Sequence, residues 1–385
     1  MKHVPYSRQT ITEADVAAVA DILRSDWLTQ GPTVPAFEQA FATRHEVANA
    51  VAVANATAAL HISCLALGAG PGKRVWTTPN SFLASANCAL YCGASVDFVD
   101  IDPETRNMSV ADLASRLERA TSDTLPNIVI PVDFSGLPCD IREMRALADR
   151  FGFKLLEDAS HATGASYLGK PVGSQFADAT VFSFHAVKIV TCGEGGMVTT
   201  PDAALAARLR LLRSHGMTRD AADLHYESDG PWYYEQIDLG FNYRLTDIHA
   251  ALGLSQLSRL EEMHAARIAL ANRYDLLLEG MPVRRPVRLP DRASAWHLYV
   301  IEIDSTKATV TRREVFDALR AANIGVNVHY IPIHTQPHYR RLGFQRGMFP
   351  ASEKYYEGAI SLPLFPALTE QDQTRVVEVL RGVLG

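Results

Sequence analysis

Hydrophobic residues recur along the chain in two alternating patterns, one typical of buried strands and one typical of helices. Short apolar runs rich in β-branched residues predict seven strands, at residues 51–54, 75–78, 96–99, 128–134, 154–156, 180–184 and 197–200. Between the first five runs, apolar positions at helical spacing predict helices at residues 58–67, 83–91, 110–120 and 141–150. This alternation predicts an α/β fold whose mostly parallel seven-stranded sheet is sandwiched by helices.

A smaller C-terminal α/β domain is predicted from the same patterns. A long helix is expected over residues 246–271, and a connector rich in Pro and Arg follows at residues 284–293. Beyond the connector we expect strands at residues 297–303, 326–330 and 360–362, and helices at residues 312–322, 352–358 and 369–383. We therefore predict a large domain over residues 1–260 and a small domain over residues 261–385.

Composition and charge narrow the class of protein. The chain has 385 residues, 47% of them hydrophobic, and a formal net charge of −6. Because an acidic chain has no general basic field, we expect no nucleic-acid partner and no membrane partner. The N-terminus lacks the continuous apolar core of a signal peptide, so we expect a cytoplasmic protein with reduced thiols.

Polar side chains follow two of the predicted strands. In parallel sheets, ligands bind beyond the carboxyl ends of the strands. Asn55-Ala56-Thr57 leads from a strand into a helix, where free backbone N–H groups and a hydroxyl could hold a phosphate, although simple helix capping explains the same residues. Asp158 ends another strand with His161 three residues later, and such a carboxylate can hold a cationic ligand nitrogen or can be a solvated turn acid.

A lysine stands between two predicted core strands. Lys188 lies in the loop that joins the apolar runs 179–184 and 197–200. Desolvation lowers the pKa of a lysine amine and favours the neutral form that reacts with a carbonyl cofactor, whereas a lysine that extends to solvent would carry no such role. A lysine, a strand-end aspartate and a phosphate cradle at one sheet edge are the three elements that a pyridoxal phosphate enzyme needs.

Five sequence segments carry a resemblance to a known family. They are Leu28-Thr29-Gln30-Gly31-Pro32, Glu157-Asp158-Ala159-Ser160-His161-Ala162, Ser183-Phe184-His185-Ala186-Val187-Lys188, Gly193-Glu194-Gly195-Gly196 and Phe241-Asn242-Tyr243-Arg244. Through them the whole chain resembles the DegT-type sugar-nucleotide aminotransferases, which are fold-type I enzymes that depend on pyridoxal 5'-phosphate.

The resemblance implies a role for individual residues. It implies that Lys188 forms the Schiff base with the cofactor, that Asp158 pairs with the pyridinium and that His161 contacts the phenolic oxygen. Other cofactor-binding residues implied in the same way are Asn55, Ala56, Thr57 and Ser183 for the phosphate, Phe82 for stacking on the ring, and Asn242 from the neighbouring subunit of a homodimer with shared active sites. Family members usually have Ser or Gly in place of Asn55 and often a hydroxyl residue in place of Ala58, so the side-chain partners of the phosphate are less defined than the backbone donors.

The resemblance also implies a substrate class. Tyr6-Ser7-Arg8-Gln9, Thr78-Pro79-Asn80-Ser81-Phe82, Leu212-Arg213-Ser214-His215-Gly216 and Gly325-Val326-Asn327-Val328-His329-Tyr330 are similar to the branch that forms UDP-4-amino-4,6-dideoxy-N-acetyl-β-L-altrosamine from L-glutamate and a 4-keto sugar, in pseudaminic acid biosynthesis. The branch that forms UDP-4-amino-4-deoxy-L-arabinose shares several of these segments and remains the alternative. The substrate-binding residues expected by this likeness are Tyr6, Thr29, Gln30, Arg213, His329 and Tyr330.

Two other functions compete with an aminotransferase. A sugar dehydratase of the same fold has histidine at the Schiff-base position, so Lys188 argues against it. A non-catalytic cofactor-binding protein is disfavoured because Lys188, Asp158 and His161 occur together. We expect no metal site, because proline interrupts the pair His334 and His338 and the cysteines show no ligand spacing.

Overall fold

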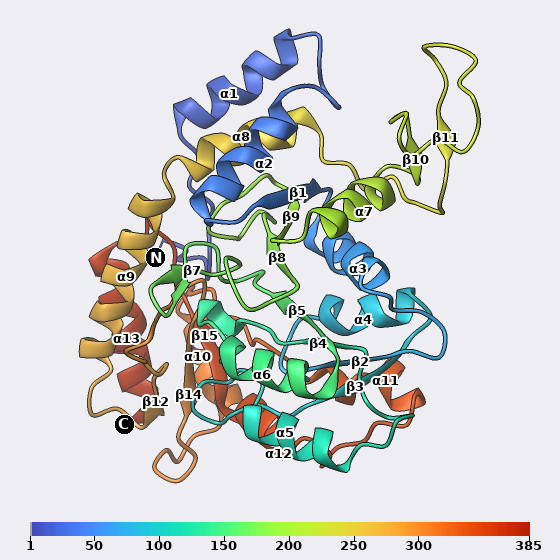
Figure 1. The fold of residues 1–385 in the computed structure, drawn as a ribbon. Helices are drawn as coiled ribbons and strands as arrows, with labels where there is room; N and C mark the ends of the chain where they lie inside the picture. The colour runs from blue at the N-terminus through green and yellow to red at the C-terminus, as the bar shows by residue number, and fades with distance from the viewer. Residues whose placement is uncertain (1) are drawn as a thin grey trace.

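The computed structural model describes residues 2–385, and a seven-stranded sheet lies at the centre of its larger part (Figure 1). The strands are β1 (Asn49–Val53), β2 (Arg74–Thr77), β3 (Ser95–Phe98), β4 (Ile128–Ile130), β5 (Lys154–Asp158), β8 (Ala179–Ser183) and β9 (Gly196–Thr200). Their order is β1-β9-β8-β5-β4-β2-β3. Only β9 among these strands runs against the others, since it pairs antiparallel with both β1 and β8. The predicted mostly parallel seven-stranded sheet is therefore confirmed.

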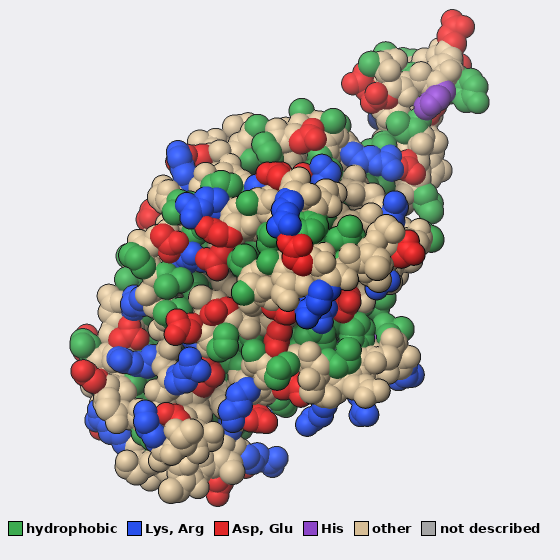
Figure 2. Space-filling model, turned by 60° about the horizontal axis from the view of Figure 1, so that its bottom comes forward, with side chains coloured by type: hydrophobic (Ala, Val, Ile, Leu, Met, Phe, Trp, Pro, Cys, Tyr) green, Lys and Arg blue, Asp and Glu red, His purple; other side chains and the backbone are tan. Residues whose placement is uncertain are grey.

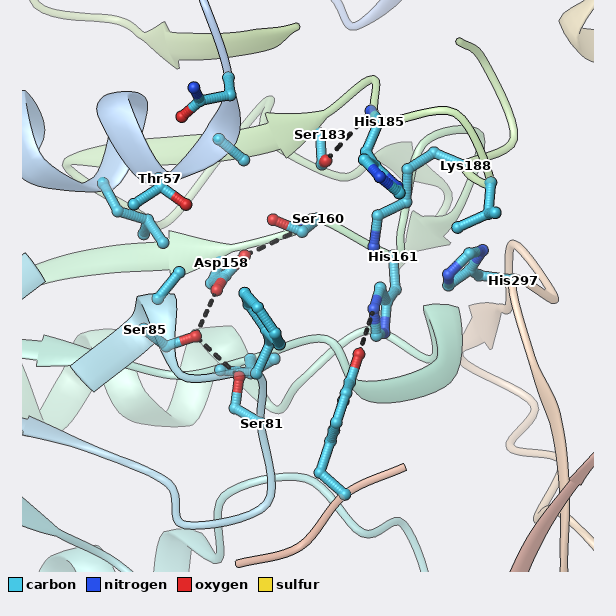
Figure 3. A pocket seen from close by; sticks show the side chains of 18 of the residues that line it. Thr57, Ser81, Ser85, Asp158, Ser160, His161, Ser183, His185, Lys188 and His297 are labelled. Atoms are coloured by element: carbon cyan, nitrogen blue, oxygen red, sulfur yellow. Dashed lines mark hydrogen bonds between the residues drawn. The ribbon is translucent and has the colours of Figure 1, made fainter. Parts of the chain in front are cut away.

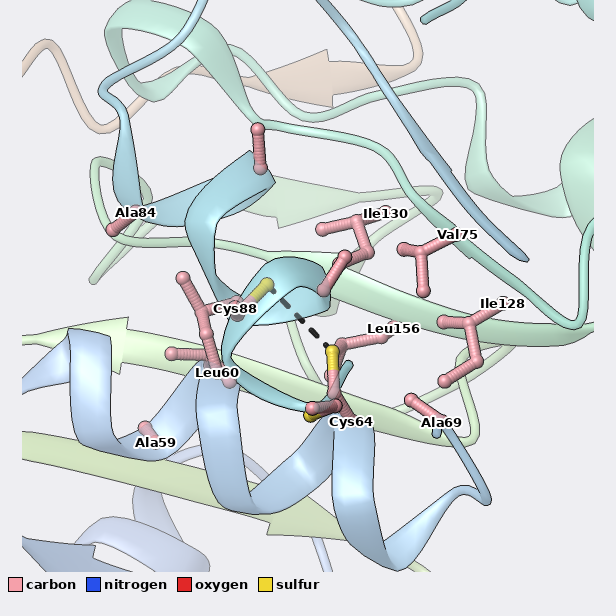
Figure 4. Packing of buried hydrophobic residues seen from close by; sticks show 14 of the residues in the cluster. Ala59, Leu60, Cys64, Ala69, Val75, Ala84, Cys88, Ile128, Ile130 and Leu156 are labelled. Atoms are coloured by element: carbon pink, nitrogen blue, oxygen red, sulfur yellow. Dashed lines mark hydrogen bonds between the residues drawn. The ribbon is translucent and has the colours of Figure 1, made fainter. Parts of the chain in front are cut away.

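Helices cover both faces of this sheet because successive strand residues point to opposite sides. The helices concerned are α2 (Thr33–Arg44), α3 (Ala56–Ala66), α4 (Ala84–Tyr91), α5 (Val110–Arg119), α6 (Ile141–Phe151), α7 (Ala203–Arg213) and α8 (Asp247–Leu257). On one face, α3 and α4 pack on residues such as Val75, Ile128 and Leu156 (Figure 4), and α7 packs beside α3 in the same apolar cluster. On the other face, α5 and α6 pack on Trp76 and Leu155, while α2 and α8 pack on β1, β8 and β9.

One long helix predicted over residues 246–271 is in fact two. The chain leaves α8 after Leu257 and enters α9 (Leu260–Leu277) only after Arg259, whose φ of −107° and ψ of 13° are not helical. The Arg259 guanidinium lies 2.6 Å from Asp15 of α1 (Glu13–Arg24), so the break lets this side chain reach the N-terminal helix. The prediction of a continuous helix was wrong because this tertiary ion pair has no signature in helical periodicity.

The C-terminal part forms a small three-stranded sheet with helices on it. Its elements are β12 (Val283–Arg284), β14 (Tyr299–Ile303), α10 (Arg312–Ala321), α12 (Pro350–Gly358), β15 (Ala359–Leu362) and α13 (Glu370–Leu384). The sheet order is β12-β14-β15. Val4 packs in the same apolar cluster and bridges to Ile324, so the N-terminal segment joins the C-terminal part although it precedes the large sheet in sequence.

Residues 326–330, predicted as a strand, form only an isolated bridge between Asn327 and Ser361. After that bridge, the carbonyl of His329 accepts a hydrogen bond from the Tyr355 hydroxyl at 2.8 Å instead of from a strand neighbour. The strand prediction was wrong here because the segment turns inward toward the cavity described below.

The remaining elements are short and lie at the surface or in connections. They are the 3-10 helices η1 (Phe134–Gly136) and η2 (Ile333–Thr335), the helix α11 (Pro337–Arg341), and the strands β6 (Ser166–Tyr167), β7 (Lys170–Pro171), β10 (Met217–Thr218), β11 (Glu235–Gln236) and β13 (Arg292–Ala293). The segment that contains β10 and β11 stands clear of the rest of the molecule (Figures 1 and 2). No helix among residues 2–385 combines the length and the apolar character that crossing a membrane requires.

Candidate active site

A cavity of about 920 Å³ opens at the carboxyl ends of the central strands. Its walls come from the N-terminus of α3, the ends of β5 and β8, the loop that carries Lys188, and the 327–330 segment of the C-terminal part. The predicted site residues that line it are Tyr6, Asn55, Ala56, Thr57, Phe82, Asp158, His161, Ser183, Lys188, His329 and Tyr330. This volume is in the range of cavities that hold a cofactor together with a substrate.

The N-terminus of α3 forms one end of the cavity, with Thr57 directed into it (Figure 3). Asn55 caps the helix, since its side-chain oxygen accepts the Ala58 N–H at 2.8 Å. A Cβ on Gly196 would lie 2.6 Å from the Asn55 carbonyl carbon, so only glycine lets β9 approach this turn. The Ser183 hydroxyl lies at the end of the neighbouring strand β8. Backbone donors at a helix N-terminus and two hydroxyls form a donor set that fits a phosphate.

Asp158 is the last residue of β5 and is 3% exposed. One carboxylate oxygen accepts the Ser85 hydroxyl at 2.6 Å, and the other accepts the Ser160 N–H at 3.1 Å (Figure 3). These donors orient the carboxylate while one side of it still faces the cavity. The arrangement fits a buried anion that pairs with a pyridinium nitrogen.

Lys188 projects into the same cavity from the loop after β8 (Figure 3). Burial lowers the pKa of its amine to about 8, and the negative charge of Asp158 opposes this shift. A substantial neutral fraction of the amine near pH 8 suits attack on an aldehyde. The lysine therefore does not simply extend into solvent.

Three histidines surround the lysine, and all three are held neutral. Burial lowers the pKa of His161 and of His297 well below the ordinary range, and the positive charge of Lys188 adds to the effect. The same two causes lower the pKa of His329 to about 4. The rings of His161 and His297 lie 4.4 Å apart between centroids. Neutral imidazoles can accept and donate hydrogen bonds here without competing with the lysine for positive charge.

Four predicted site residues do not line this cavity. Arg213 lies 2.6 Å from Glu38 and donates to the Ala52 carbonyl at 2.7 Å, so its guanidinium is already engaged behind β1. Thr29 bridges to Thr246, and Gln30 is exposed. Asn242 is also exposed and bridges to Ser214.

Sequence reasoning missed several residues that the structure brings to the cavity. These are His61, Ser81, Ser85, Glu194, Tyr243 and His297 among others. His297 was expected only as the first residue of a strand, and no sequence signal distinguishes it from a core residue. Ser81 precedes α4 and Ser85 lies in its first turn, so no helical spacing links the two serines in the sequence.

Comparison with known proteins extends these findings over the whole chain. Residues 9–381 match the model of the DegT/DnrJ/EryC1/StrS aminotransferase family. The spore coat polysaccharide biosynthesis protein SpsC of Bacillus subtilis (strain 168) is 40% identical over 384 residues, covering 99% of this chain and 97% of SpsC.

Two solved structures are similar over their full length. Helicobacter pylori PseC, an aminotransferase involved in the biosynthesis of pseudoaminic acid, is 30% identical with a TM-score of 0.90, covering 100% of this chain and 99% of PseC. The PLP-form of Spr1654 from Streptococcus pneumoniae, a putative sugar aminotransferase, is 29% identical with a TM-score of 0.89 and full coverage of both chains (100% and 100%). The chain therefore belongs to the DegT/DnrJ/EryC1/StrS aminotransferase family, and it is a sugar aminotransferase that depends on pyridoxal phosphate.

Proposed function

We propose that this enzyme transfers the amino group of L-glutamate to C4 of a UDP-linked 4-keto-6-deoxy-N-acetylhexosamine. The product would be UDP-4-amino-4,6-dideoxy-N-acetyl-β-L-altrosamine, as in the pseudaminic acid pathway. The observation that carries this proposal is the full-length likeness to PseC, at 30% identity. The higher identity to SpsC, 40%, supports a role in the biosynthesis of a polysaccharide precursor. The second candidate is the amination of another nucleotide-linked 4-keto sugar, such as the precursor of UDP-4-amino-4-deoxy-L-arabinose.

Different residues of the chain have different roles in this reaction. Bound pyridoxal phosphate supplies the electron sink that lets an amino group pass from donor to acceptor. The Lys188 amine would hold the cofactor and, once released, could carry a proton between the two carbons that flank the transferred nitrogen, because burial lowers its pKa to about 8. Asp158 would hold the ring nitrogen, and Thr57, Ser183 and the α3 N-terminus would hold the phosphate.

The sugar is assigned to the side of the cavity formed by the C-terminal part. Tyr6, Asn327, His329 and Tyr330 line this side. The His329 ring nitrogen Nδ1 lies 2.7 Å from the Ser361 hydroxyl, which fixes the ring orientation. Contact of Thr29, Gln30 and Arg213 with substrate stays a prediction, and for Arg213 it requires release of the Glu38 ion pair.

The substrate is tested by product analysis. The purified enzyme is incubated with L-glutamate and with single UDP-, GDP- or dTDP-linked 4-keto sugars, and each product is identified by mass spectrometry and NMR. We expect the 6-deoxy-N-acetyl substrate to be aminated at C4 with the highest kcat/KM. Faster amination of the 4-keto pentose would replace this proposal with the second candidate.

We propose that the enzyme is a homodimer whose active sites are shared. The projecting segment around β10 and β11 exposes Tyr226 (76%), Trp232 (69%) and Leu239 (76%), a concentration of apolar surface that favours burial against a protein. Asn242 follows this segment directly and does not line the cavity of its own chain. The family resemblance implies that, in a dimer that buries this segment, Asn242 reaches the phosphate end of the partner's cavity.

Mixing two inactive variants tests the shared site. In Lys188→Ala the chain keeps Asn242, and in Asn242→Ala it keeps Lys188. If Asn242 acts across the interface, exchange of subunits restores activity, because each mixed dimer contains one complete site. Absence of recovery, with exchange verified by native mass spectrometry, would contradict the proposal.

We also propose a cytoplasmic location. All five cysteines, Cys64, Cys88, Cys92, Cys139 and Cys192, are free and buried. Unpaired thiols fit a reducing compartment. Fractionation of the producing cells, followed by immunodetection, tests the location directly.

A further inference from the structure

Two buried serines form a hydrogen-bonded chain that ends on Asp158 (Figure 3). Ser85 is the second residue of α4, and its hydroxyl oxygen lies 2.6 Å from Oδ2 of Asp158. The Ser81 hydroxyl oxygen lies 2.7 Å from that of Ser85. Ser81 is 4% exposed and Ser85 is 1% exposed, so bulk water does not compete for these bonds.

The direction of both hydrogen bonds follows from the chemistry of the groups. An ionised carboxylate only accepts hydrogen bonds, so the Ser85 hydroxyl must donate to Asp158. A hydroxyl has one proton, and Ser85 must therefore accept from Ser81. Successive hydroxyls that donate in one direction polarise each other and strengthen the final bond to the charged group.

Asp158 is not the only buried acid at this place. Asp133 lies beside it across the extension of β4, and its N–H donates to the Asp158 carbonyl at 3.1 Å. Burial, with a smaller contribution from the negative charge of Asp158, raises the pKa of Asp133 to about 7. Burial, followed by the charge of Asp133, raises the pKa of Glu157 well above its ordinary range. Several buried acids in one region cannot all be charged, so the local donors decide which of them carries the charge.

The hydrogen-bond donors favour Asp158. Both of its carboxylate oxygens accept hydrogen bonds, from Ser85 and from the Ser160 backbone. For Asp133, no donor within residues 2–385 reaches Oδ2. We propose that Ser85, supported by Ser81, is a positioning residue that keeps the negative charge of this acid group on Asp158 and holds its carboxylate toward the pyridine nitrogen of the cofactor.

The charge on Asp158 has a consequence that can be read without any sugar substrate. A charged partner keeps the pyridine nitrogen protonated, and that positive charge lowers the pH at which the nitrogen joining the cofactor to Lys188 loses its proton. Loss of the proton from the nitrogen that joins the cofactor to Lys188 changes the absorbance of the bound cofactor. The midpoint of a pH titration of absorbance therefore reports on the strength of the Asp158 pairing.

The test compares holoenzyme variants by this titration. In Ser85→Ala, loss of one hydrogen bond to a charged group should move the midpoint upward by about one pH unit. Ser81→Ala should move it in the same direction by less, and Ser85→Thr, which keeps a hydroxyl, should leave it near the wild-type value. Ser63→Ala is the matched control, because Ser63 is a buried serine on neighbouring α3 whose hydroxyl has no partner within residues 2–385.

Each result bears on the proposal. An unchanged midpoint in Ser85→Ala would overturn the proposal, because the hydrogen bond would then have no effect on the Asp158 pairing. An equal shift in Ser63→Ala would also overturn it, because the loss of a buried hydroxyl that does not contact Asp158 would then produce the same effect. If Ser85→Ala does not retain the cofactor, the Ser81→Ala titration decides, and an unchanged midpoint there overturns the proposal. The titration uses no sugar, so it is independent of the identity of the amino acceptor.

Discussion

The Tyr330 hydroxyl lies 3.2 Å from Nε2 of His161 and connects the C-terminal part of the chain to the edge of the central sheet. The other ring nitrogen of His161, Nδ1, accepts the backbone N–H of Ser135 at 3.2 Å. Since the ring is neutral, its proton must lie on Nε2, where it is donated to Tyr330. The Ser135 backbone N–H thus selects the tautomer of His161, and Tyr330 accepts the remaining N–H of this histidine, which faces the cofactor site.

Replacing Tyr330 with Phe should reduce turnover more than it reduces stability. The ring would remain, but the His161 N–H would lose its acceptor, which costs about 1 kcal/mol in a buried site and corresponds to roughly a fivefold loss of kcat. Steady-state kinetics and thermal unfolding of the holoenzyme measure the two effects. Tyr274→Phe is the matched control, because this buried hydroxyl donates to the Pro363 carbonyl at 3.0 Å away from the cavity. Equal kcat in both variants would contradict a role for Tyr330 at the site.

The central sheet could be predicted from sequence because most of its strands are buried on both faces and carry short apolar runs. The edge strand β3 differs, since one of its faces is partly exposed. Helix α2 was missed, since Pro32 and Pro35 look like helix breakers. Both stand where proline is tolerated: Pro32 is the N-cap, and Pro35 lies in the first turn, where backbone N–H groups have no helical partner. Local patterns therefore describe the sheet better than they describe the ends of its surrounding helices.

The residues of the candidate site also include some that could be predicted from the sequence and some that could not. Asp158 and Lys188 could be predicted, because a charged residue at the end of an apolar strand is conspicuous. Ser85 could not be predicted, because its role depends on contact with Asp158, which lies 73 residues away in the sequence. His297 could not be predicted either, because its role depends on the contact of its ring with His161, which belongs to the other part of the chain. Arg213, a cation at a helix end that was expected to bind substrate, pairs with Glu38 in this structure, and its contact with substrate stays a prediction.

The covalent capture of pyridoxal phosphate by the cofactor-free protein should depend on pH through Lys188. Only the neutral amine attacks the aldehyde, and its fraction rises as the pH passes through the pKa. Because burial lowers that pKa to about 8 from an ordinary 10.5, the capture rate should rise with pH up to a midpoint near 8 and then level off. Stopped-flow absorbance measures this rate.

The control for the capture experiment is Asp158→Asn. The charge of Asp158 raises the pKa of Lys188, so its removal should move the midpoint below that of the wild type. A wild-type midpoint near 10.5 would mean that the amine is solvated when it reacts, contrary to its position in the cavity.

Gly196→Ala should disrupt the phosphate end of the site. The added Cβ would lie 2.6 Å from the Asn55 carbonyl carbon and 2.8 Å from the Ala56 nitrogen, and both are backbone atoms that cannot turn aside. We expect a loss of about 1–3 kcal/mol in the free energy of unfolding and weaker binding of pyridoxal phosphate. Urea unfolding and equilibrium dialysis measure the two quantities.

The control for the Gly196→Ala substitution is Gly382→Ala. Gly382 lies in helix α13, and a Cβ built there meets nothing within 4 Å. The same substitution should leave cofactor affinity unchanged and raise stability slightly, because alanine favours the helix. If Gly196→Ala bound the cofactor as well as Gly382→Ala does, the close approach of β9 would have no role in the phosphate site.

Buried His45 should make the protein unstable in mild acid. Its ring stacks on Phe41 with centroids 4.1 Å apart, and Nδ1 donates to the Val172 carbonyl at 2.8 Å. Burial lowers the pKa of His45 to about 4 from an ordinary 6.5, so between these values the unfolded chain binds a proton that the folded chain does not. Stability from this group is therefore complete above pH 6.5 and is lost as the pH falls toward 4, by about 3 kcal/mol in total.

Urea unfolding of the wild type and of His45→Phe between pH 4 and pH 7 tests this assignment. Phenylalanine keeps the stacking on Phe41 but leaves the Val172 carbonyl without its donor, so at pH 7 the variant should be less stable by about 1 kcal/mol. It has no ring nitrogen to protonate, and its stability should therefore fall less steeply with decreasing pH, until the two curves meet or cross. Parallel curves over the whole range would assign the acid sensitivity to the other buried histidines, His161, His297 and His329, whose pKa values are lowered as well.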